Sequence, residues 1–176
     1  ADARGTRGLD LAAFPTAITT NLILPDGHVA GLDLTAGRSL IVRNYHGRPL
    51  GPNDPGVGPL PIVIDQHLTM DASSMLRLIL DANGNWDSTI SFAPGIPITR
   101  GGTLELTFAS GVDLASQLGR TLDLFHWTGV NPTGTFTVDS PYLWDLSKLY
   151  TTGEVTLENL LFPGDLGDDG HVNVAD

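Results

Sequence analysis

The stretch Met75-Leu76-Arg77-Leu78-Ile79-Leu80-Asp81-Ala82-Asn83-Gly84-Asn85 decides the fold class. Because successive side chains of a β-strand point to opposite faces, Leu76, Leu78 and Leu80 form one fully apolar face, and the other face is nearly apolar. The Asn-Gly turn supplies residues that accept positive φ, and Asp87–Phe92 then resumes the apolar run, so the stretch predicts a β-hairpin. Burial on both faces predicts that this hairpin lies between two packed sheets.

The same pattern extends over most of the chain. Thr103–Phe108 has the cleanest alternation, with Leu104, Leu106 and Phe108 expected to point inward. From Thr19 onward, short apolar runs are separated by turn residues about every 8 to 12 positions, which is typical of sandwiches and barrels. Apart from one or two helical turns expected near residues 111–119, no helical periodicity is present. We therefore predict an all-β fold, a β-sandwich or jelly roll.

A short β-helix is the alternative fold. Glycine-punctuated runs such as Gly31-Leu32-Asp33-Leu34-Thr35-Ala36-Gly37-Arg38-Ser39-Leu40 favour it. A solenoid normally shows a fixed repeat period, and none is found in this sequence. The sandwich is therefore the favoured prediction.

Residues 44–61 form one long loop rich in proline and glycine, which cannot join a sheet interior because proline lacks a backbone donor. Either it is a spacer over a sheet edge, or it carries a polar binding site. The residues available for such a site are Tyr45, His46, Arg48, Asn53 and Asp54.

The last twelve residues, Asp165-Leu166-Gly167-Asp168-Asp169-Gly170-His171-Val172-Asn173-Val174-Ala175-Asp176, have the spacing of a calcium loop. Glycine occupies the turn position, and oxygen ligands fall in the register that a hard cation requires. The expected ligands are the side chains of Asp165, Asp169, Asn173 and Asp176 and the carbonyl of His171. Asp168 should point to solvent. Gly167 replaces one side-chain ligand, so a water is expected there, and the loop resembles those of type I dockerins, which also end in aspartate.

Composition narrows the partners and the compartment. The 176 residues carry a net charge of −11, which argues against nucleic acid as a partner because phosphates require a basic face. No apolar run is long enough to span a membrane. Cysteine is absent. The start Ala1-Asp2-Ala3 suits a mature form left after removal of a secretory signal, so a secreted, extracellular or cell-surface location is expected.

A family resemblance supports that location. The segments 122–130, 144–145 and 149–155, followed by the calcium loop, resemble the C-terminal region of large secreted β-rich surface proteins of environmental bacteria. These proteins end in a dockerin-type, EF-hand-like calcium loop or a sorting signal, and the resemblance covers roughly residues 68–176. It implies an exported β-protein with calcium as its cofactor, and it implies no catalytic residues.

The residue pattern does not favour an enzyme. The five histidines lie on separate segments without metal-ligand spacing, and neither a nucleophile elbow nor a phosphate-binding loop is present. A carbohydrate-binding or anchoring module is the alternative function, with Trp86 as the best candidate for an exposed ring. Trp127 and Phe125 share one strand face, which favours a core position for both.

We expect three parts: residues 1–14 as an N-terminal arm, 15–162 as the β-sandwich domain and 163–176 as the calcium loop. The arm is either a frayed terminus or a strand that pairs with a sheet edge in its own or a neighbouring molecule. The sequence therefore predicts a structural subunit that forms a homo-oligomer or polymer, a filament or surface layer stabilised by calcium, with carbohydrate as a partner in the alternative.

Overall fold

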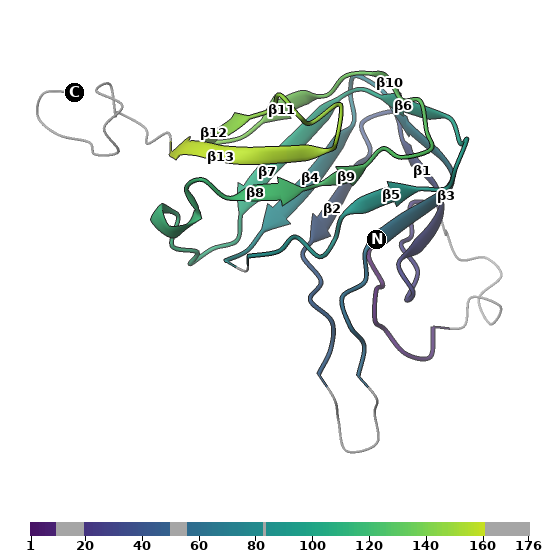
Figure 1. Ribbon diagram of the computed structural model, residues 1–176. Coiled ribbons are helices and arrows are strands. Elements are labelled where there is room, and N and C mark those ends of the chain that lie inside the picture. Colours follow the sequence, from purple (N-terminus) through teal and green to yellow (C-terminus); the bar gives the residue numbers. More distant parts are fainter. Residues whose placement is uncertain (10–19, 50–55, 83, 161–176) are drawn as a thin grey trace, which may run out of the picture.

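The computed structural model describes residues 1–9, 20–49, 56–82 and 84–160, and within these ranges it is almost entirely β (Figure 1). The all-β prediction is confirmed. The elements are β1 (His28–Leu34), β2 (Ser39–Arg43), β3 (Ile62–Met70), β4 (Met75–Leu80), β5 (Ile90–Phe92), β6 (Ile98–Arg100), β7 (Thr103–Phe108), the 3₁₀ helix η2 (Ala115–Gln117), β8 (Thr121–Asp123), β9 (Phe125–His126), β10 (Thr133–Gly134), β11 (Thr137–Asp139), β12 (Tyr142–Asp145) and β13 (Glu154–Leu160). The described part of the chain has no helix long and apolar enough to cross a membrane.

Two parallel sheets make up most of the molecule. In the first, β1 pairs with β3, whose two halves pair with β5 and β6, and these pair in turn with β9 and β10. In the second, the order is β11-β7-β4-β2. All these pairings are parallel, as in the β-helix alternative, whereas the strands of a jelly roll pair antiparallel, so the prediction of a β-sandwich or jelly roll is not confirmed. The predicted hairpin is wrong, because β4 pairs with β2 and β7 and not with β5.

The chain winds through these sheets in four coils. Leu40, Leu76, Leu104 and Val138 occupy equivalent places in successive coils and are 36, 28 and 34 residues apart. The coils differ in length because the connections after β2, β4 and β7 differ. This variation explains why the sequence shows no fixed period.

Stacked rows of apolar side chains fill the space inside the coils. Along β7 the pattern alternates as predicted, with Leu104, Leu106 and Phe108 buried and the intervening residues partly exposed. Leu78 of β4 lies in register with Leu106 and Val42, so each coil adds one apolar residue to a continuous row. Full burial of each such side chain contributes roughly 1.5–3 kcal/mol.

An antiparallel sheet, β12-β13-β8, closes the C-terminal end of the coils (Figure 1). Aromatic rings gather near it: the ring of Phe125 stacks on Trp127 at 4.7 Å and on Phe136 at 5.6 Å. The indole N–H of Trp127 donates to the carbonyl of Leu149 at 2.8 Å. The predicted core positions of Phe125 and Trp127 are confirmed, with exposed fractions of 0% and 7%.

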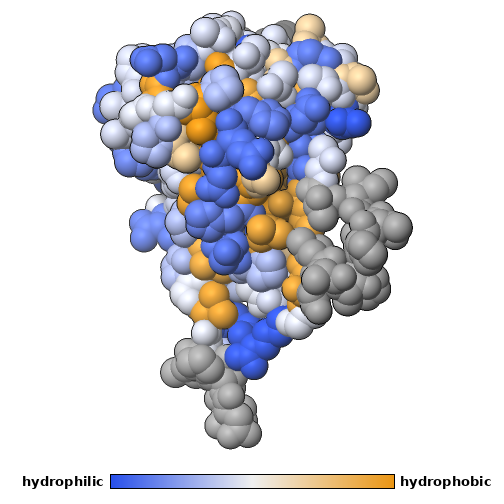
Figure 2. Space-filling model, turned by 90° about the vertical axis from the view of Figure 1, so that its right-hand side faces the viewer, coloured by the Kyte–Doolittle hydropathy of each residue, from blue (hydrophilic) through white to orange (hydrophobic). Residues whose placement is uncertain are grey.

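The outer surface is largely polar on the side of β1, β3 and β6. Figure 2 shows a continuous hydrophilic band on this face, with apolar surface beside it. At the corner between the two sheets, successive coils are joined by hydrogen bonds: Asp71 accepts the N–H of Ala36 at 2.7 Å, and the hydroxyl of Ser73 accepts the N–H of Gly37 at 2.9 Å.

The long loop after β2 extends away from the coils as two neighbouring segments (Figure 1). Its described parts, residues 44–49 and 56–61, are joined by an antiparallel bridge between Arg48 and Val57. Tyr45 and His46 lie at its base. Asn53 and Asp54, named above for a polar site, lie outside the described residues.

Candidate functional site

The predicted calcium ligands Asp165, Asp169, His171, Asn173 and Asp176 all lie outside the described residues, as does Asp168. Within the described ranges, no group of three or more histidine, aspartate or glutamate side chains is placed to hold a metal ion. The calcium site therefore stays a prediction.

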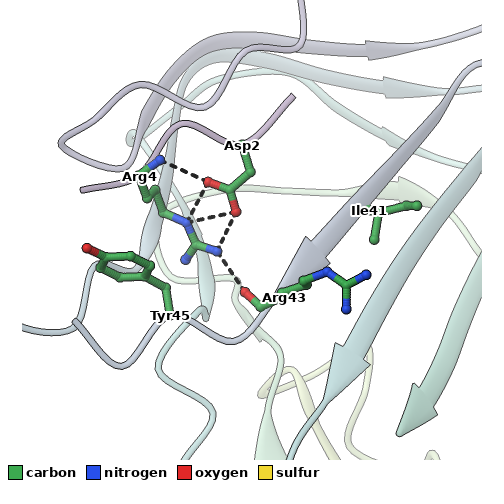
Figure 3. Close-up of a pocket in the computed structure, with 5 residues that line it drawn as sticks. All are labelled: Asp2, Arg4, Ile41, Arg43 and Tyr45. Carbon is green, nitrogen blue, oxygen red and sulfur yellow. Dashed lines mark hydrogen bonds and ion pairs between the residues drawn. The ribbon is translucent and has the colours of Figure 1, made fainter. Parts of the chain in front are cut away.

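A pocket of about 390 Å³ lies along the outer side of β2. We call it the β2-edge pocket, and its lining residues are Asp2, Arg4, Ile41, Arg43 and Tyr45 (Figure 3). It brings together the N-terminal arm, the first coil and the base of the long loop, which are far apart in the sequence.

Arg4 fixes the arm in this place. Its side chain is 1% exposed and its guanidinium pairs with the carboxylate of Asp2 at 2.7 Å. It also donates to the carbonyls of Leu60 at 2.7 Å and Arg43 at 2.8 Å and to the hydroxyl of Ser88 at 2.7 Å. Because a buried cation is stable only when its donors are satisfied, this set of partners determines where the arm lies.

The arm also forms one isolated parallel β-bridge, between Asp2 and Ile23. Ile23 donates its N–H to the carbonyl of Ala1 at 2.8 Å, and Ala3 donates to the carbonyl of Ile23 at 2.9 Å. Among the described residues of the arm, this single bridge lies within the same chain, and the two predicted alternatives for the arm stay open.

The edge of β2 carries backbone groups that point away from the sheet. The carbonyl of Arg38 accepts the N–H of Met75 in β4, so the alternation along a strand directs the groups of Leu40 and Val42 to β4 as well. The N–H and C=O of Ser39 and Ile41 then face outward. No described residue hydrogen-bonds to them, and the Ile41 side chain is 45% exposed.

Two other edges of the coil stack are covered in part. At β1, the side-chain amide of Asn21 pairs with both backbone groups of Asp33, at 2.6 Å and 2.7 Å. At β9, the carbonyl of Gly153 accepts the N–H groups of Leu124 and Phe125 at 3.0 Å and 3.2 Å. The β2 edge therefore differs from these two in leaving its backbone groups open.

A histidine held between two carboxylates adjoins the pocket. The Nδ1 of His46 lies 2.6 Å from Asp87 and its Nε2 lies 2.5 Å from Asp81. Partial burial acts to lower the pKa of His46, but the hydrogen bonds and negative charges of Asp87 and Asp81 outweigh it and raise the pKa above its usual value. The ring of His46 thus connects the base of the long loop to the segment after β4.

The three tryptophans are all buried. Trp86, Trp127 and Trp144 are only 6%, 7% and 7% exposed. The prediction of an exposed Trp86 is wrong, because the ring lies within the main apolar core. Tyr150 is more exposed, at 37%, and its ring lies against Phe136.

No protein-family model, curated protein or solved structure matches this chain. The fold and the side-chain geometry therefore carry the functional argument.

Proposed function

We propose that this protein is a non-catalytic structural module of the cell exterior that associates with copies of itself and is stabilised by calcium. The observation that carries the proposal is the open edge of β2. An exposed row of unpaired N–H and C=O groups is a template for pairing with another chain, and proteins that stay monomeric normally cover it.

Two features of the coils support a structural role. Each coil buries its own apolar row against its neighbours, so one continuous apolar core runs through the stack. The outer faces carry matched charges, such as the ion pair between Arg77 and Glu105 at 2.7 Å, which lie in register on β4 and β7.

Calcium enters the proposal through the spacing of Asp165, Asp169, His171, Asn173 and Asp176. Oxygen ligands at these intervals suit a cation of that size, and a protein outside the cell meets calcium in abundance. We expect the assembly to be a filament or a surface layer. The extracellular location rests on the resemblance to secreted β-rich surface proteins of bacteria.

Sedimentation velocity of the intact protein over a wide concentration range, with calcium and with a chelator, tests this function. We expect the weight-average mass to rise with concentration in calcium. A strictly monomeric protein up to about 1 mM would contradict self-assembly, since even weak contacts populate dimers at that concentration.

The carbohydrate-binding alternative makes the opposite prediction. It requires a monomer that is retained on polysaccharide, and with all three tryptophans buried it would depend on tyrosine rings to stack on sugar. Affinity electrophoresis through soluble glucans and mannans, compared with a gel without sugar, measures such retention directly.

A further inference from the structure

We propose that the outer edge of β2 pairs with the same edge of a second copy, antiparallel and about a two-fold axis through Ile41. This inference rests on the proposed self-assembly and specifies which surface of one copy contacts the next. Each four-stranded parallel sheet, β11-β7-β4-β2, would then continue into that of its partner.

The backbone of β2 provides the hydrogen bonds. In an antiparallel ladder centred on Ile41, the two Ile41 residues exchange both of their N–H···O=C bonds. The N–H of Arg43 then faces the carbonyl of the partner's Ser39. The carbonyl of Arg43 already accepts from Arg4 and Ser88 within its own chain, so about four inter-chain bonds result.

The side chains of β2 are complementary to themselves in this register. Leu40, which is 4% exposed, lies opposite the partner's Val42, so the two apolar cores become continuous. On the outer face Ile41 lies opposite itself, and Ser39 lies opposite the partner's Arg43. The two Arg43 side chains are four residues apart along the ladder, or about 13 Å, which keeps like charges apart.

Space and charge favour a second copy as the occupant. The β2-edge pocket leaves about 390 Å³ beside Ile41, between the strand and the N-terminal arm. No charged residue or proline interrupts residues 39–42, although such residues are the usual protection of an exposed edge. Residues 40–42 are apolar in either direction of the strand, so two copies of β2 in antiparallel register place apolar residues opposite apolar residues.

The contact is short, so we expect a weak dimer, with a dissociation constant on the order of 0.1 mM. A two-fold contact closes on itself. Pairs are therefore the unit from which a longer assembly grows through a second contact.

Substitution of Ile41 tests the contact. In Ile41→Lys the two lysines lie opposite each other, and we expect the dimer dissociation constant from sedimentation to rise at least about tenfold. Leu143→Lys is the matched control, because Leu143 is 43% exposed and lies on β12, and it should associate like the unchanged protein. Circular dichroism and melting temperature of both variants establish that they fold.

Cysteine substitution tests the register. The chain has no cysteine, and the hydrogen-bonded Ile41 pair places two Cα atoms about 5.5 Å apart, within disulfide reach. Ile41→Cys should therefore form a disulfide-linked dimer under mild oxidation, whereas Ser39→Cys and Leu143→Cys should stay largely monomeric.

The outcomes separate the two proposals. If the unchanged protein self-associates but Ile41→Lys associates equally well, or if Ile41→Cys crosslinks no faster than Leu143→Cys, the β2 contact is wrong and self-assembly stands. If the unchanged protein is monomeric at all concentrations, both proposals are overturned.

Discussion

The side-chain amide of Asn21 hydrogen-bonds to the N–H and the carbonyl of Asp33, in the way that the backbone of a neighbouring strand would. Its oxygen accepts the N–H of Asp33 at 2.6 Å, and its nitrogen donates to the carbonyl of Asp33 at 2.7 Å. Asn21 has a φ of 58°, a conformation that asparagine tolerates better than most residues. One side chain thus satisfies both backbone groups of Asp33 on β1, whereas no described residue pairs with those of Ser39 and Ile41 on β2.

Asn21→Asp should destabilise the fold by about 1–3 kcal/mol, because the carboxylate cannot donate to the carbonyl of Asp33 and leaves it unpaired. Urea unfolding followed by circular dichroism measures this change. Asn131→Asp is the control, since Asn131 is exposed, and it should change stability by less than about 0.5 kcal/mol. Equal stability of the two variants would show that the Asn21 pairing contributes nothing.

Arg4→Met should cost about 3 kcal/mol or more, because it removes the cation that holds Asp2 and leaves the hydroxyl of Ser88 and two carbonyls without this donor. Arg38→Met is its control: Arg38 is 54% exposed and lies 3.7 Å from Asp33, so its loss should cost less than about 1 kcal/mol. Thermal unfolding of both variants at one pH decides the matter. A melting temperature of Arg4→Met equal to that of Arg38→Met would mean that the arm does not depend on Arg4.

Strand positions were predictable from this sequence, but strand partners were not. The alternation in Thr103–Phe108 depends only on which face is buried, so it is the same for parallel and antiparallel neighbours. The partners of β4 lie 36 residues before it and 28 after it, and these distances depend on loops with no repeated length. The hairpin prediction failed because the turn residues after β4 carry no information on its pairing with β2 and β7, which are distant in the sequence.

The β2-edge pocket was hidden from sequence for a related reason. Arg4 belongs to a short glycine-containing arm that gives no sign of burial. Two of its partners are backbone carbonyls, of Leu60 and Arg43, and every residue has such a group. Only the coiling of the chain brings these positions together.

The raised pKa of His46 makes stability depend on pH in a defined direction. A group whose pKa is higher in the folded state stabilises the fold fully below its unfolded pKa, about 6.5, and loses that contribution as the pH rises through the folded value. We therefore expect the melting temperature to fall as the pH rises above about 6.5. In His46→Asn this part of the pH dependence should disappear.

His28→Asn provides the control for His46. His28 faces a single carboxylate, Asp65 at 3.0 Å, and lies on β1 at the surface. Melting curves of this variant between about pH 5.5 and 8.5 provide the comparison for a histidine with one carboxylate partner, and His46→Asn should lose more of the pH dependence than His28→Asn does. If His46→Asn keeps the slope of the unchanged protein, another group is responsible.

Calcium should raise stability by mass action. At a calcium concentration 100 times the dissociation constant the gain is about 2.7 kcal/mol if the ion binds only the folded form, and a chelator should remove it. Asp165→Asn and Asp176→Asn should weaken the response, because each replaces a charged ligand with a neutral one. Asp168→Asn, at the position expected to face solvent, should respond to calcium normally; an equal loss in all three variants would point to net charge and not to a site.

Gly153 provides a test of the closure at the C-terminal end of the coils. Its φ is 95°, and a Cβ at this residue would lie 1.8 Å from the carbonyl oxygen of Phe125, in the same place where Gly153 accepts the N–H groups of Leu124 and Phe125. Gly119 has a φ of 76° with no atom near its missing Cβ, so alanine there meets backbone strain alone. We expect Gly119→Ala to cost about 1 kcal/mol and Gly153→Ala clearly more, with faster hydrogen exchange of the Leu124 and Phe125 amides only in the latter. Both variants carry strain at positive φ, so the additional loss of unfolding free energy in Gly153→Ala reports the close approach of Gly153 to β9, and no additional loss would contradict that contact.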